Sequence, residues 1–287
     1  MTRCDNKNLI MKVIKPILIL CVAALFATSC KKDVDMTLVQ KTVLENSDIR
    51  QIEVSEAWPV TIVSDSVTYV ELAYSAYLEP YVKAHMEGNK LEIGFTTNVY
   101  PAINSEFRAT VHTSHLEKLD LNDAVQVQSH GEFAGQRIEL ALSDASKCNG
   151  LVFSGESCMI KMEDASLMTG FQFVGTACHA ELDDASQFNG EIQSAEQFDI
   201  ELKSASRFVN KGGETATANI KLHDASILNM VETRVGTMHV ELNSASEATV
   251  QVADFVDGTL KEASTLYYKG HPQMNIDCSD DSQLIPF

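Results

Sequence analysis

Apolar and polar residues alternate along the second half of the chain, and the alternation returns at a fixed spacing of 20 residues. Two apolar columns show it: Ile138, Cys158, Cys178, Phe198, Ala218 and Met238 form one, and Leu140, Ile160, Ala180, Ile200, Ile220 and Val240 form the other. The positions between the columns are mostly charged. A period of two residues is typical of strands with one buried face. No stretch of the chain keeps helical spacing over three turns, so the pattern predicts an all-β fold.

A short motif of an apolar residue, two polar residues, Ala and Ser marks the same period. Six copies follow one another, at Leu142–Ser146, Met162–Ser166, Leu182–Ser186, Leu202–Ser206, Leu222–Ser226 and Leu242–Ser246, with degenerate copies at Leu121–Val125 and Leu260–Ser264. One half-buried strand cannot cover its own apolar face, but coils stacked at ~4.8 Å place identical columns on one another. Residues 121–272 are therefore predicted to form a right-handed parallel β-helix with coils of about 20 residues, since parallel crossovers are nearly always right-handed.

Residues 46–120 lack this period but remain strand-like. We expect an N-terminal β region that covers the first coil, built either as a small sandwich or as irregular coils. A covered first coil has no unpaired edge on which other chains could aggregate. Residues 273–287 are expected to form a C-terminal cap or tail.

The motif places carboxylates on one another in successive coils, which raises the question of a binding or catalytic site. Asp144, Asp164 and Asp184 recur at the same place in successive coils, where spacing of ~4.8 Å could support a calcium ladder or acid–base catalysis. The alternative is a sharp turn, because Asp tolerates a positive φ and accepts backbone hydrogen bonds. Exposed like charges at this spacing cost only ~1 kcal/mol per pair in water, so no cation is required.

The turn interpretation is favoured because the motif recurs on every coil, whereas a catalytic constellation belongs to one coil. It predicts that each Ala points inward and each Ser bonds along the stack. We therefore predict no catalytic residue, no metal centre and no cofactor, with the aspartate ladder kept as the candidate calcium site. Cys158 and Cys178 share an inward column and are expected to be buried thiols, with a disulfide between them as the alternative.

The start of the chain indicates export. Four basic residues precede the apolar run of residues 17–27, which is too short to span a bilayer and has the length of a signal-peptide core. The run ends in Ala27-Thr28-Ser29-Cys30, which resembles the lipobox of bacterial lipoproteins. Residues 1–29 are thus predicted to be a signal peptide, Cys30 the lipidation site, and residues 30–45 a lipidated linker. Ordinary cleavage that leaves a free Cys30 is the alternative.

The net charge of the chain limits the classes of partner that we expect. The chain carries a net charge of −18, and loss of the four basic residues and one acidic residue before Cys30 leaves −21. Such a chain repels nucleic acid and anionic membrane surfaces. The expected partner is an unidentified protein or glycan ligand, and contact with the membrane is expected only through the lipid anchor. The predicted location is the outer membrane, facing the periplasm or the cell surface.

Several segments resemble a known family, described as "putative auto-transporter adhesin, head GIN domain". The resemblance covers roughly residues 45–275 and rests on Ile52–Val54, Pro59–Ile62, Gly88–Ile93, Leu260–Ser264 and Tyr268–Pro272. Family corners commonly carry Gly where this chain has Asp144, Asp164, Asp184 and Asp224, while Ser204, Ser244 and Glu262 depart from that pattern. The family implies a right-handed β-helix and adhesion, and it supplies no functional residues to carry over.

Repetition without a unique chemical site indicates a non-enzymatic adhesion, binding or scaffold module that uses an acidic β-helix surface. A carbohydrate-active β-helix enzyme, acting as a polysaccharide lyase or hydrolase, is the rival hypothesis. It would need one coil with three carboxylates and a basic residue in a deep groove. A structural envelope protein, or the partner of a sensor, is a third alternative that the sequence does not separate from adhesion.

Overall fold

The computed structural model describes residues 34–97 and 99–287, and residues 36–287 form one compact unit. Twenty-one strands and one short 3-10 helix, η1 (Ala76–Leu78), make up the described secondary structure. None of the described helices is long and apolar enough to cross a membrane. The predicted signal peptide and the predicted lipidation site at Cys30 lie outside the described residues.

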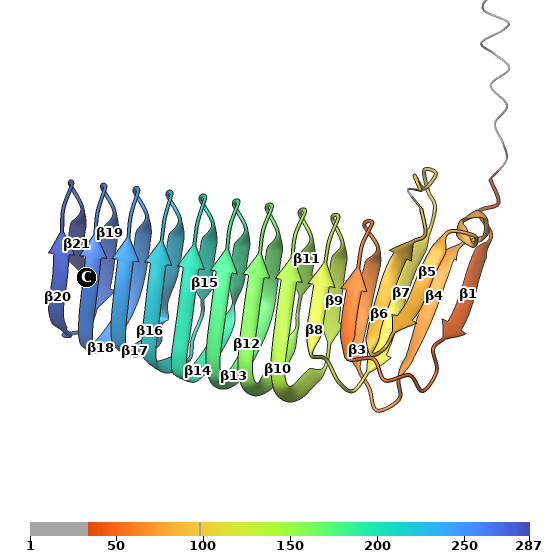
Figure 1. Ribbon diagram of the computed structural model, residues 1–287, viewed down its shortest axis with the longest axis horizontal. Helices are drawn as coiled ribbons and strands as arrows, with labels where there is room; N and C mark the ends of the chain where they lie inside the picture. Colours follow the sequence, from red (N-terminus) through yellow and green to blue (C-terminus); the bar gives the residue numbers. More distant parts are fainter. Residues whose placement is uncertain (1–33, 98) are drawn as a thin grey trace, which may run out of the picture. The chain divides into compact units, whose positions relative to one another are not determined.

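Each coil has a strand segment before the tight turn and another after it, and these stack into two sheets (Figure 1). The pre-turn sheet contains, in spatial order, β5 (Val82–Glu87), β6 (Lys90–Phe95), β2 (Gln51–Val54), β8 (Lys118–Leu121), β10 (Glu132–Leu142), β12 (Val152–Met162), the ends of β13 (Leu167–Leu182) and β14 (Gln187–Leu202), β16 (Glu214–Leu222), the ends of β17 (Ile227–Leu242) and β18 (Glu247–Leu260), and β20 (Gln273–Cys278).

The post-turn sheet packs behind it. It contains β1 (Leu38–Val43), β4 (Tyr69–Ser75), β7 (Phe107–Thr113), β3 (Pro59–Ser64), β9 (Gln126–His130), β11 (Lys147–Asn149), the starts of β13 and β14, β15 (Arg207–Asn210), the starts of β17 and β18, β19 (Thr265–Lys269) and β21 (Gln283–Pro286).

The predicted right-handed parallel β-helix is confirmed. Equivalent residues of successive coils pair in parallel register, as in Ile138 with Cys158 and Cys158 with Cys178. In Figure 1 the near strands rise to the turns, the far strands descend and the chain advances from right to left, which is a right-handed path. The apolar columns point between the sheets, where Phe188 and Phe208 stack with ring centroids 4.3 Å apart.

The N-terminal region adopts the irregular coils, one of the two arrangements expected for it. β2 and β3 form a coil that lies directly on the first regular coil, through parallel pairing with β8 and β9. β6 and β7 then lie on the other side of β2 and β3. Antiparallel strands β5, β4 and β1 complete this end of the stack. At the other end, residues 273–287 form the two strands of the last coil.

Candidate functional surface

The repeated motif forms a row of tight turns along one edge of the stack. Asp144 and Ala145 have φ values of 53° and 60°, and every later copy repeats this left-handed pair. Ser146 N donates to the Ser143 carbonyl at 3.1 Å, which closes the turn. Two successive residues with positive φ define a type I′ turn. The structure thus explains the aspartate column by its backbone conformation.

The turns are also bonded to one another. The Ala145 amide donates to the Asp164 carbonyl, the Ala165 amide to the Asp184 carbonyl and the Ala185 amide to the Ser204 carbonyl, at 2.8–2.9 Å. A ladder of backbone hydrogen bonds therefore continues from the sheets through the turns. A side chain at the Asp position does not contribute to this ladder, which explains why Ser204, Ser244 and Glu262 can replace Asp.

The predicted orientation of the alanines is wrong. Ala145, Ala165 and Ala185 are exposed at the tips of the turns, whereas the following serines are buried. In a type I′ turn both central residues project away from the strands, so the fourth residue is the first to face the core. Buried Ser226 Oγ donates to the His223 carbonyl at 2.7 Å, within its own turn. Other serines bond along the stack as predicted: the Val125 amide donates to Ser146 Oγ at 3.2 Å, and Ser264 Oγ donates to the Leu242 carbonyl at 3.1 Å.

Two further tight turns were not predicted from the sequence. Glu56-Ala57 and Asp280-Asp281 have the same pair of positive φ values. Trp58 takes the place of the buried Ser in the first, and Asp281 takes the place of Ala in the second. The alternation in Ile52–Val54 just before Glu56-Ala57 was the available signal.

The aspartate ladder faces solvent. Asp144, Asp164 and Asp184 are exposed. Partial desolvation, followed by the neighbouring charges of Asp144 and Asp184, raises the pKa of the Asp164 carboxyl above its ordinary value of 3.8. Among residues 34–97 and 99–287, no three His, Cys, Asp or Glu side chains converge as a metal site.

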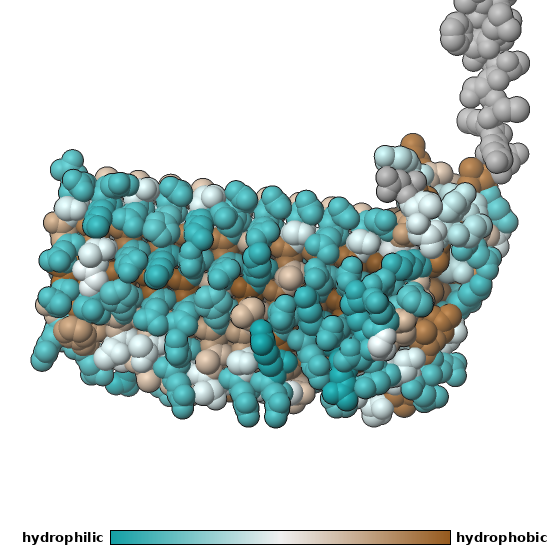
Figure 2. Space-filling view, in the orientation of Figure 1, coloured by the Kyte–Doolittle hydropathy of each residue, from teal (hydrophilic) through white to brown (hydrophobic). Residues whose placement is uncertain are grey.

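The two outer faces of the stack differ in charge. We call the acidic face the charged and histidine side chains in the register columns of Glu139 and Ala141, from β10 to β20 of the pre-turn sheet: Glu139, Lys161, His179, Glu181, Asp199, Glu201, Lys221, His239, Glu241, Asp257 and Asp277. Carboxylates outnumber lysines on this face. Figure 2 shows hydrophilic side chains over most of it.

We call the register columns of Lys147 and Asn149 on the post-turn sheet the amide face, because most of their side chains are uncharged. Gln126, Gln128, Asn149, Thr169, Gln187, Asn189, Asn229 and Thr249 are amides or threonines, Leu167, Val209 and Ile227 are apolar, and Lys147, Arg207 and Glu247 are charged. Asn149 Nδ2 donates to Gln128 Oε1 at 2.7 Å, and Thr169 Oγ1 donates to Asn149 Oδ1 at 2.9 Å. These bonds link the side chains of neighbouring coils.

Several carboxylates on the acidic face are paired with lysine or histidine side chains, among them Glu181, Glu201, Glu241 and Asp257. Lys203 is the main reason that the pKa of Glu201 lies below its ordinary value. Partial burial lowers the pKa of His239, but hydrogen bonds to Glu241 and Asp257 outweigh it and raise the pKa above 6.5. A general acid needs a raised carboxyl pKa, so the pairing of Glu201 does not suit it to that role.

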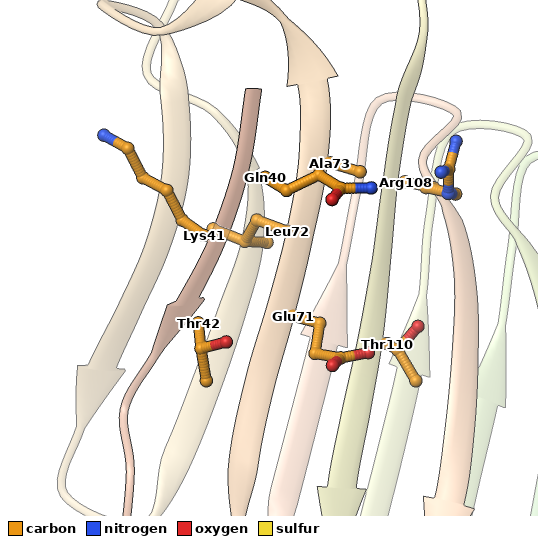
Figure 3. Close-up of a pocket in the computed structure, with 8 residues that line it drawn as sticks. All are labelled: Gln40, Lys41, Thr42, Glu71, Leu72, Ala73, Arg108 and Thr110. Carbon is orange, nitrogen blue, oxygen red and sulfur yellow. The ribbon is translucent and has the colours of Figure 1, made fainter. Parts of the chain in front are cut away.

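A shallow hollow on the outer side of β1, β4 and β7 is also mainly polar (Figure 3). Lys41 at its rim pairs with Glu79, and Arg108 Nη1 donates to Glu106 at 2.9 Å. None of the eight labelled residues is a histidine or cysteine. The hollow therefore offers no paired nucleophile and imidazole base from its own lining.

The inward cysteines are free thiols in the structure. Cys158 and Cys178 are register partners in neighbouring coils and both are buried. Burial raises the pKa of the Cys148 thiol to about 12, and burial together with Cys158 raises that of Cys178. Such thiols are poor nucleophiles and pack as small apolar groups, as expected for this column.

Comparison with known proteins supports the fold. Residues 48–272 match the family model described as "Putative auto-transporter adhesin, head GIN domain". A "putative adhesin" from Parabacteroides merdae is similar in structure, with a TM-score of 0.66 and 11% identity over 88% of this chain and 96% of that one. No curated protein sequence is matched.

Two structures from Parabacteroides distasonis are also similar. One is titled a "putative adhesin", with a TM-score of 0.58 and 13% identity over 88% of this chain and 98% of that one. The other is titled a "Putative lipid binding protein", with a TM-score of 0.61 and 14% identity over the same shares. At these identities the likeness establishes the fold alone.

Proposed function

This chain belongs to the family described as "Putative auto-transporter adhesin, head GIN domain", and we propose that it is a non-enzymatic adhesion or scaffold module of the bacterial cell envelope. It is exported by its signal peptide and anchored through lipidated Cys30. Its acidic face binds a protein or glycan partner. The names of its structural neighbours, two of them adhesins, agree with a binding role.

One observation carries the proposal: the outward chemistry repeats along the stack instead of concentrating in one coil. The acidic face runs over successive coils from Glu139 to Asp277, at one set of side chains per coil. A repeated, rigid face suits multivalent contact with an extended or repetitive partner. Its charge favours partners with basic groups.

The rival hypothesis of a carbohydrate-active enzyme requires carboxylates tuned for proton transfer in a groove. Lys161 pairs with Glu163 at 2.7 Å, and Lys203 pairs with Glu201. Both pairs are substantially exposed on the surface. Ion pairing favours the charged form of a carboxylate and opposes its use as a general acid, so this arrangement favours binding over catalysis.

Binding and turnover can be measured on the same protein. The purified chain is incubated with neutral and acidic polysaccharides and with solubilised outer-membrane proteins. Bound partners are recovered and reducing ends or unsaturated products are assayed. We expect retention of a partner with no product. Sustained product formation from any polysaccharide would overturn the proposal.

Matched variants locate the binding face. Asp199→Asn with Glu241→Gln removes charge from the acidic face, and Asn149→Ala with Asn189→Ala alters the amide face. Partner affinity is expected to fall about tenfold for the first pair and to change little for the second. The opposite result would move binding to the amide face. Surface proteolysis of intact cells then distinguishes display outside the cell from a periplasmic location.

A further inference from the structure

One coil replaces its tight turn with a longer loop. β6 and β7 are the two strands of this coil, because they pair in parallel with β2 and β3, the strands of the next. Residues 96–106 join them, where the β2–β3 coil has only the turn at Glu56-Ala57. In Figure 1 this loop projects beyond the row of turns. The solenoid does not require this extra length.

The loop presents apolar side chains to solvent. Tyr100 is 92% exposed and Ile103 is 88% exposed, more than any other large apolar residue that the structure describes. No charged residue occurs from Thr96 to Ser105, in a chain with a net charge of −18. Isolated exposed apolar residues are ordinary, but this pair shares one uncharged projection.

Hydrogen bonds hold the loop in shape. The Ala102 amide donates to Tyr77 Oη at 2.7 Å, and the Ser105 amide donates to the Ala102 carbonyl at 3.0 Å. Ser105 Oγ also donates to the Ala102 carbonyl, at 2.6 Å. The exposure of Tyr100 and Ile103 thus belongs to a braced turn.

The beginning of the compact unit, at Met36, lies at the same place. The Ala76 amide donates to the Thr37 carbonyl at 2.8 Å, so this segment and the loop both contact Ala76–Tyr77. Met36 and Leu38 there are both 41% exposed. Figure 2 shows hydrophobic surface at this end of the unit.

Chain length fixes how far a lipid on Cys30 can be from this end. Met36, the first residue of the compact unit, follows Cys30 by six residues, and six residues reach at most ~22 Å when fully extended. An acylated Cys30 would therefore hold the β1 end of the protein close to the bilayer surface. The loop beside it would then lie within reach of the headgroups.

We propose that Tyr100 and Ile103 dock this end of the protein on the phospholipid bilayer that holds the lipid anchor. The inference rests on the proposed anchoring at Cys30. Tyrosine suits the headgroup region, since its ring is apolar and its hydroxyl is polar, and isoleucine suits the acyl boundary. The uncharged loop avoids repulsion by lipids, and a second contact restricts the tilt of the stack on its anchor.

Fluorescence quenching tests the contact directly. Full-length Ile103→Trp protein, purified from membranes, is reconstituted in phosphatidylcholine vesicles with brominated acyl chains. Val174→Trp is the matched control, because Val174 is 56% exposed and lies on β13, away from the loop. Trp58 is buried and common to both. We expect quenching of the added indole only in Ile103→Trp. Equal quenching in the two proteins would overturn the docking proposal.

Failure of the anchor is distinguishable from failure of docking. If the Cys30→Ala protein leaves the membrane fraction but Ile103→Trp shows no quenching, the proposed anchoring at Cys30 is supported and the docking proposal is rejected. If Cys30→Ala protein stays with membranes, anchoring at Cys30 is rejected. Docking is then tested by vesicle partition of the Cys30→Ala protein, which Tyr100→Ser with Ile103→Ser should reduce about tenfold.

A second copy of the chain is the competing occupant of this surface. Sedimentation of the Cys30→Ala protein with and without Tyr100→Ser and Ile103→Ser separates the two cases. A monomer in both forms is expected. A dimer that the substitutions dissociate would show that the loop joins two copies and would overturn the membrane proposal. Unchanged melting temperatures would confirm that the variants fold.

Discussion

At the residue scale, the turns show how two unfavourable conformations are maintained. Asp184 and Ala185 have φ values of 49° and 60°, a region that costs a residue with a Cβ roughly 1 kcal/mol or more. The turn-to-turn bond from the Ala185 amide to the Ser204 carbonyl, at 2.9 Å, helps to hold this geometry. Exposure at the first position leaves the choice of side chain open to Asp, Ser or Glu.

The stacked carboxylates predict a pH-dependent effect. The folded state raises the pKa of Asp164, so ionisation opposes folding once the pH rises above the ordinary value of 3.8. Asp164→Asn should therefore raise the melting temperature at pH 7 and have no charge effect well below pH 3.8. Asp224→Asn is the matched control, because its neighbours in the column are Ser204 and Ser244. Equal shifts in both variants at both pH values would contradict this account.

The effect of calcium on the melting temperature distinguishes a row of turns from a ladder of carboxylates that binds the cation. If the column is conformational, calcium and chelator leave the melting temperatures of wild type and Asp184→Gly nearly equal, since Gly adopts positive φ without steric cost. A ladder that binds calcium would instead stabilise only the wild type, by an amount that grows with calcium concentration. Thermal melts of both proteins with calcium and with chelator make the comparison.

At the element scale, packing at the corners limits side-chain size. Gly155 and Gly175 are register partners where the strands bend between the two sheets. A Cβ on Gly175 would overlap the Gly155 carbonyl oxygen and the Phe173 ring. Backbone from the neighbouring coil cannot move without disturbing the ladder, so these corners require glycine for space.

Gly175→Ala is predicted to destabilise the protein by about 1–3 kcal/mol, as overpacking typically does. Gly88→Asn is the control: Gly88 also lies in a turn, but a Cβ added there would meet no other atom within 4 Å, and its φ of 64° suits Asn. Urea unfolding should give a change of less than about 0.5 kcal/mol for the control. A tolerated Gly175→Ala would show that the corner can shift.

At the scale of the whole molecule, stability is the sum of coils and of the contacts between neighbours. Gln187 and Arg207, the residues that follow the turn serines of two successive coils, are register partners. A deletion that joins Ser186 to Arg207 therefore keeps the strand segments on both sides of the turn paired with equivalent residues.

Removal of residues 187–206 is expected to leave a cooperative solenoid whose melting temperature falls by no more than about 10 °C. Removal of residues 187–196 is the contrasting change, because it places outward residues and corners on mismatched partners. That protein should lose its cooperative transition. Circular dichroism melts of both deletions give the answer, and equal damage from the two would argue against modular coils.

Anchoring also belongs to the whole molecule. Cys30→Ala is expected to move the protein from the membrane fraction to the soluble fraction, because the proposed lipid chains would be its principal attachment. Fractionation of cells that express each form measures the change. Mass spectrometry of the wild-type N-terminal peptide provides the control, since it detects acylation of Cys30 directly.

The sequence by itself determined the regular part of the stack. Its columns, such as Leu140, Ile160 and Ala180, recur at one spacing and alternate with polar residues, so a single register satisfies all of them. Period-two alternation fixes which side of a strand is buried. It does not apply inside a turn, where the sign of φ decides, and for this reason Ala145 was wrongly expected to point inward.

The spatial order of the N-terminal strands was decided by the tertiary structure. The chain passes from β1 to the β2–β3 coil, then back through β4, β5, β6 and β7 before it reaches β8. Such long-range pairing depends on which exposed edge each strand meets, and the local pattern of residues 46–120 is compatible with more than one partner. The same pairing places the loop of Tyr100 and Ile103 in the position of a turn, beside the start of β1.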